Sequence, residues 1–172
     1  IGARGEYSSV EEVVIRGSSI RLNEEYTYNY CTIGGGTNGS FGSIDIQNSQ
    51  IHIPSSGGNT AIGNGWQVYY NRESRIRIAN SEVSVRCASL GPAIGAAWDS
   101  GSGRINIIIE NSTVTAKGGN LRTDGNYVPG IGKNALGRAP EIGIQILNST
   151  VDSFRLTEKG GTDYVYDDLH TK

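Results

Sequence analysis

The chain contains 172 residues, which is enough for one domain with a substantial core. Its 25 glycines lack the strict three-residue period of collagen, so they indicate many tight turns instead. A formal net charge of −2 gives no basic excess for nucleic-acid binding, and no apolar run approaches the roughly 18 residues of a membrane-spanning helix.

Apolar and polar residues alternate through residues 13–22, with Gly17-Ser18 in the middle of the run. Alternation with a period of two is typical of strands that bury one face. The same pattern, with Asn-Ser in place of Gly-Ser, returns at residues 44–53, 76–85, 107–116 and 144–151. Because the alternation shifts by one position at each Asn-Ser, we expect the chain to bend there and begin a second strand.

A second signature, Ile-Gly, alternates with these strand pairs along the chain. It begins at Ile1, Ile33, Ile62, Ile94 and Ile131. We expect a third short strand at each of these sites, with the glycine allowing the backbone to turn. Both signatures recur about every 29–37 residues, and two markers that share one period indicate a repeat architecture.

Three short strands per repeat predict an all-β fold, a right-handed parallel β-helix of about five coils over residues 1–153. A single coil cannot bury its own apolar face, so neighbouring coils must stack with equivalent residues about 4.8 Å apart. Residues 154–172 lose the pattern and are expected to form a C-terminal cap or tail.

The asparagines of the Asn-Ser signature are expected to stack as an internal structural ladder, with their amides bonded to the backbone or to each other. Gly17 interrupts this predicted ladder in the first repeat. The members of the ladder are Asn48, Asn80, Asn111 and Asn148.

The two cysteines, Cys31 and Cys87, stand at unequal repeat positions, so the sequence favours two buried free thiols over a disulfide. The two histidines, His52 and His170, do not supply the spacing of a Cys/His metal site. No metal or other cofactor is therefore expected.

The Asn-Ser-x-Val strands resemble the repeats of right-handed β-helix surface proteins, as do glycine-rich turns such as Ile33-Gly34-Gly35-Gly36 and Ile62-Gly63-Asn64-Gly65. Such repeats belong to adhesin-like proteins that are secreted or attached to the cell surface. The resemblance covers about residues 1–153 and implies an extracellular or cell-surface location with a carbohydrate-facing role. That implication rests on analogy between folds.

Aromatic residues follow several Ile-Gly signatures at distances of four to eight residues. In a solenoid, equal repeat positions share one side of the molecule, and Trp66 and Trp98 have the same offset. We therefore expect an aromatic flank that binds sugar rings or a protein partner, with packing of these loops against the core as the alternative. The candidate ligand-binding residues are Tyr7, Phe41, Trp66, Tyr69, Tyr70 and Trp98.

The carboxylates do not form a pair that recurs at one repeat position. A site that cleaves polysaccharides needs two carboxylates that face the same glycosidic bond. The sequence therefore favours a non-enzymatic adhesion or carbohydrate-binding module of a larger surface protein, with a glycan or host-surface ligand. A structural spacer that self-associates end to end is one alternative, and a small polysaccharide lyase or hydrolase is another. Neither nucleic-acid binding nor direct membrane insertion is expected.

Overall fold

The computed structural model describes residues 1–3, 7–22, 31–56, 60–66, 72–87, 91–97, 103–120, 128–134 and 140–156. These residues form strands, turns and bends, with no helix among them. Within this part of the chain there is accordingly no helix long and apolar enough to span a membrane.

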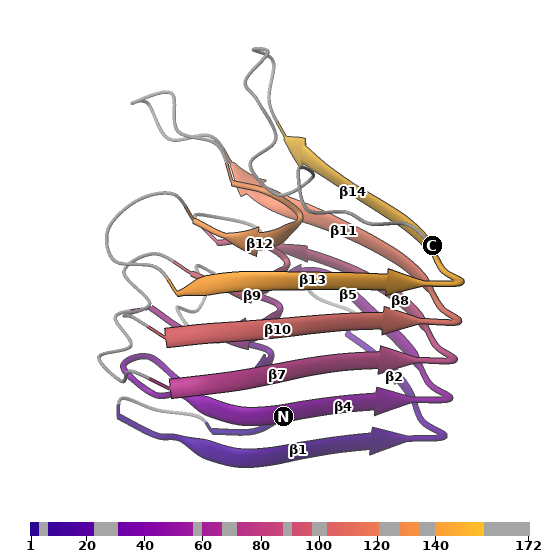
Figure 1. Cartoon of the computed structure of the whole chain (residues 1–172). Helices are drawn as coiled ribbons and strands as arrows, with labels where there is room; N and C mark the ends of the chain where they lie inside the picture. Colours follow the sequence, from indigo (N-terminus) through magenta and orange to yellow (C-terminus); the bar gives the residue numbers. More distant parts are fainter. Residues whose placement is uncertain are drawn as a thin grey trace.

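The strands form three parallel sheets, and each sheet takes every third strand of the chain (Figure 1). The first sheet has the order β1-β4-β7-β10-β13, made of Val10–Arg16, Phe41–Gln47, Arg72–Ala79, Gly103–Glu110 and Glu141–Leu147. The second has the order β2-β5-β8-β11-β14, made of Ser19–Arg21, Gln50–Ser56, Glu82–Cys87, Thr113–Asn120 and Thr150–Leu156. The third has the order β3-β6-β9-β12, made of Ile33–Gly34, Ile62–Asn64, Ile94–Ala96 and Ile131–Lys133. The predicted all-β, parallel solenoid-like arrangement is confirmed.

Equivalent residues of successive repeats pair directly with one another in every sheet. In the first sheet Ile46 pairs with Ile78, and Ile78 pairs with Ile109. In the third sheet Ile62 pairs with both Ile33 and Ile94. All of these isoleucines are fully buried, so the alternating apolar positions of the sequence become continuous ladders of one hydrophobic core.

The glycines of the Ile-Gly signature also stack. The backbones of successive repeats approach so closely there that no side chain fits between them. Gly63 and Gly95 have φ angles of 138° and 130°, which L-residues with a side chain rarely adopt. A Cβ atom on Gly95 would lie 1.9 Å from the carbonyl oxygen of Gly132 in the next repeat. The signature is therefore a packing requirement between repeats as well as a turn within one.

The last strand, β14, continues to Leu156 and so extends three residues beyond the predicted end of the repeat region at residue 153. The rest of the predicted cap or tail, residues 157–172, lies outside the described residues.

Candidate functional site

Each Asn-Ser bend is a corner between the first and second sheets where the asparagine backbone is left-handed. The φ angles of Asn48, Asn80, Asn111 and Asn148 lie between 47° and 49°, a region that asparagine and glycine tolerate better than other residues. Gly17 has a φ of 55° at the equivalent corner, so it continues this series instead of interrupting it. All four asparagines are exposed, and their predicted internal placement is wrong.

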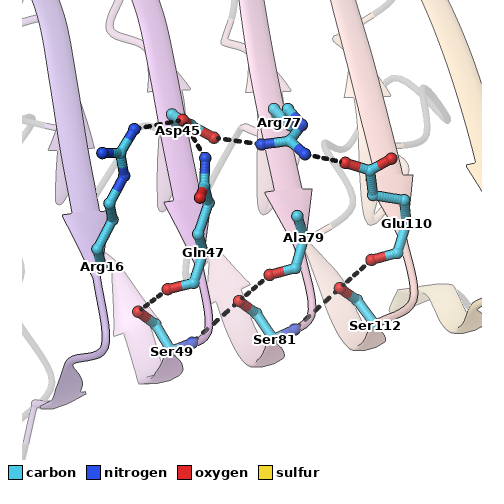
Figure 2. Close-up of polar contacts among 9 residues, drawn as sticks. All are labelled: Arg16, Asp45, Gln47, Ser49, Arg77, Ala79, Ser81, Glu110 and Ser112. Atoms are coloured by element: carbon cyan, nitrogen blue, oxygen red, sulfur yellow. Dashed lines mark hydrogen bonds and ion pairs between the residues drawn. The ribbon is translucent and has the colours of Figure 1, made fainter.

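The hydrogen-bonded ladder at this corner is made by the serine that follows each asparagine (Figure 2). The N–H of Ser49 donates to the Oγ of Ser81 at 3.1 Å, and the N–H of Ser81 donates to the Oγ of Ser112 at 3.1 Å. The same bond joins Ser18 to Ser49 and Ser112 to Ser149. Each hydroxyl donates in turn to the carbonyl two residues before it, at 2.7–2.8 Å. The signal in the sequence was the serine itself, which is present in all five bends, including the one with glycine.

We expect the substitution Ser81→Ala to lower the free energy of unfolding by about 1–3 kcal/mol, because it removes the acceptor of the Ser49 N–H at a buried corner. Urea denaturation would measure the change. Ser84→Ala is the matched control, since it removes a half-buried hydroxyl outside the ladder. Equal losses of stability in the two variants would show that the ladder has no special role.

A shallow groove, open to solvent, follows the corner across three repeats and has a volume of about 500 Å³. Unlike the enclosed and mostly apolar clefts that are usual for small ligands, this groove is open and its lining is mostly polar. Its amides and hydroxyls supply both donors and acceptors, and Glu82 is the one charged residue of the lining. The groove is lined by Asn48, Ser49, Gln50, Asn80, Ser81, Glu82, Asn111 and Thr113.

Beside this corner, charged side chains form a network across the outer face of the first sheet (Figure 2). Arg77 donates to Asp45 at 3.2 Å and also to Glu110, and Gln47 donates to Asp45 at 2.6 Å. Burial alone would lower the pKa of Arg77, but its bonds to Glu110 and Asp45 outweigh this effect and raise the pKa. The more exposed Arg16 lies 3.6 Å from Asp45 and adds little to the network. These charges are therefore engaged mainly with one another.

The structure places three of the six predicted ligand-binding aromatic residues. Tyr7 is 70% exposed, whereas Trp66 is half-buried. The N–H of Tyr7 donates to the carbonyl of Thr37, and the N–H of the next residue, Asn38, donates to the carbonyl of Trp66. Tyr7 and Trp66 therefore lie on the same flank, with one repeat between them. Outside the described residues are Tyr69, Tyr70 and Trp98.

Phe41 does not belong to this flank. It is the first residue of β4 and is fully buried in the hydrophobic core, so its predicted role in ligand binding is wrong. Its carbonyl accepts a hydrogen bond of 2.6 Å from the buried Ser74 of the neighbouring strand. Phe41 therefore serves the packing of the sheets, which is the alternative that the sequence had left open.

The two cysteines are free thiols in the structure, as predicted, but only Cys87 is buried, whereas Cys31 is half-buried. The sulfur of Cys31 contacts the hydroxyl of Thr60 and donates to the carbonyl of Gly63 at 3.1 Å. Burial raises the pKa of the Cys31 thiol to about 12, so the reactive thiolate is scarce at neutral pH. Because the unfolded thiol has a pKa near 9.0, this group stabilises the fold below that pH, and its contribution is lost as the pH rises towards 12.

We expect iodoacetamide to label Cys31 and the fully buried Cys87 very slowly in the native protein at neutral pH. Mass spectrometry after a short exposure would count the labelled thiols. The same exposure in urea is the control and is expected to label both. Fast labelling of native Cys31 would contradict the raised pKa of its thiol.

Among the described residues, the carboxylates of Asp45 and Glu110 are both bound to Arg77, and the other carboxylates lie elsewhere. Asp45 is bound to Arg77 and Gln47, Glu82 lies in the groove, and Asp152 lies on β14. Within the described ranges, histidine, cysteine, aspartate and glutamate do not gather into any group that could hold a metal ion.

Comparison of this chain with protein-family models, with curated proteins and with solved structures finds no match, so the case for a function rests on the corner groove and its residues.

Proposed function

We propose that this chain is a non-enzymatic carbohydrate-binding module and that the glycan lies along the corner groove. The observation that carries the proposal is the row of exposed asparagines, one per repeat, on a backbone that the serine ladder hydrogen-bonds from repeat to repeat. Parallel strands repeat about every 4.8 Å, which is close to the length of one sugar unit in an extended polysaccharide. A linear glycan parallel to the stack could therefore meet an equivalent amide at each successive sugar.

The chemistry of the groove suits a neutral glycan. Sugar hydroxyls both donate and accept hydrogen bonds, and the amides of Asn48, Asn80 and Asn111 do the same. Glu82 is the only charge in the lining, and its negative sign disfavours uronate polymers. A shallow, hydrated groove also permits water-mediated contacts, which contribute nearly as much enthalpy as direct hydrogen bonds.

The aromatic flank is a second contact surface within the same proposal. Tyr7 is exposed there and Trp66 is half-buried, and rings at such positions can stack on the apolar faces of sugars. The flank supports the proposal less strongly than the groove, because among its predicted residues that the structure describes, Trp66 is half-buried and Phe41 lies in the core.

The proposal includes the finer architecture and the location of the protein. We take the parallel sheets to wind as a right-handed β-helix of about five coils, since crossovers between parallel strands are right-handed in about 98% of cases. The resemblance to adhesin-like repeats supports an extracellular or cell-surface protein of which this chain is a part.

Binding to a glycan array of neutral and uronate polysaccharides, followed by calorimetry on the best ligand, tests the proposal. We expect the triple substitution of Asn48, Asn80 and Asn111 by glycine to weaken binding about tenfold or more, since it removes three amides. Glycine keeps the left-handed backbone, so the fold is retained.

The matched control is Asn148→Gly, which makes the same change at the same type of corner but outside the groove. It is expected to bind like the unmodified chain. A triple variant with full affinity would rule out the groove. If Trp66→Ala and Trp98→Ala weaken binding instead, the site lies on the flank.

A further inference from the structure

Within the described chain, the first and second sheets end in strands that pair on one side only: β1 and β2 at one end, β13 and β14 at the other (Figure 1). An open edge presents a row of backbone donors and acceptors that favours pairing with a further strand. We propose that copies of this chain stack head to tail, so that β1 and β2 of one copy extend the sheets beyond β13 and β14 of another. This inference is independent of glycan binding.

The serine ladder ends in an acceptor on one side and in a donor on the other. The Oγ of Ser18 donates to the carbonyl of Arg16 at 2.8 Å, as the other ladder hydroxyls do, but no N–H of a described residue donates to it. At the far end, the N–H of Ser149 has no acceptor among the described residues, although its hydroxyl accepts from Ser112 at 3.0 Å. A bond from the Ser149 N–H to Ser18 of a second copy would repeat the bond made at every internal step.

This bond fixes the register of the junction, because the pairing inside each sheet keeps equivalent residues opposite one another. With Ser149 opposite Ser18, Asp152 of β14 lies opposite Arg21 of β2, and both side chains are exposed. Opposite charges in directly facing positions stabilise a strand pair. The other outward pairs contain no like charges: Gly143 with Glu12, Gln145 with Val14, Leu147 with Arg16, and Thr150 with Ser19.

The core is also incompletely covered at these two ends. The apolar residues that pack against the core but are only partly buried all belong to the end repeats, whereas Ile51 and Ile107, the central equivalents of Ile20 and Ile144, are at most 2% exposed. These partly buried residues are Val10, Ile20 and Leu22 at one end, and Ile142, Ile144 and Val151 at the other. In the register given above, Ile20 faces Val151 and Val13 faces Ile144, so stacking would bury these pairs, and burial between repeats is the usual source of stability in repeat proteins.

Two charge reversals test this junction by light scattering over a wide concentration series. The unmodified chain is expected to grow beyond its 18.3 kDa monomer as its concentration rises, because a head-to-tail contact does not close. Asp152→Lys alone sets Lys against Arg21, and Arg21→Asp alone sets Asp against Asp152, so each variant by itself should associate about tenfold more weakly. An equal mixture restores opposite charges at every junction and is expected to recover the association of the unmodified chain.

The matched control is Ser84→Lys, which adds a positive charge in the same outward row but on the central strand β8, and it should associate normally. Circular dichroism of each variant checks that the fold is retained. The proposal is overturned if the unmodified chain stays monomeric at all concentrations, or if the mixture associates no better than either variant alone.

Discussion

Replacing Gly95 with alanine is expected to abolish folding or to lower the free energy of unfolding by more than about 4 kcal/mol. The new Cβ would lie 1.9 Å from the carbonyl oxygen of Gly132, and the φ of 130° is itself unfavourable for alanine. Neither residue can move away, because both are paired within the third sheet. Circular dichroism and urea denaturation of the purified variant would measure the loss.

Gly17 provides the control for this prediction. Its φ is 55°, and a Cβ built on it meets no atom within 4 Å. Gly17→Asn is therefore expected to leave stability unchanged or to raise it by about 0.4–1 kcal/mol, since it restricts the unfolded chain and matches the other corners. If the Gly95→Ala variant were as stable as the Gly17→Asn variant, the result would contradict the close approach of the backbones at Gly95 and Gly132.

Phe41→Ala is the second large effect, and we expect it to cost about 3–5 kcal/mol because it leaves a cavity in the core. The midpoint of urea denaturation, measured with its slope, would report this change. Phe41→Leu fills most of the space and should cost clearly less. A Phe41→Ala variant of unchanged stability would place this ring outside the core.

The Phe41 variants also separate packing from binding. Phe41→Leu should keep the glycan affinity of the unmodified chain, because the ring has no exposed surface. A folded Phe41→Leu variant with reduced binding would return this residue to the ligand-binding set.

The positions of the strands could be predicted because they depend on local patterns. Ile44 and Ile46, then Ile51 and Ile53, alternate with polar residues, and such alternation with a fixed period allows few arrangements other than stacked parallel strands. The isoleucine ladders followed directly, since one repeat cannot cover its own apolar face.

The corner could be predicted only in part. The sequence located the bend at Asn48-Ser49, but whether the asparagine faced inward depended on its φ angle. Gly17 at the equivalent position indicated a left-handed backbone at the corner, because glycine and asparagine are the residues that most readily adopt it. A buried ladder of amides would not require that conformation.

The sequence by itself therefore determined the repeat, the strand positions and the set of apolar residues that form the core. The tertiary structure decided which polar residues face solvent, that Phe41 packs inward, and that the Ile-Gly glycines exclude a side chain. The reason is physical: alternation is a property of one strand, whereas exposure at a corner and clearance beside Gly95 depend on the neighbouring repeat.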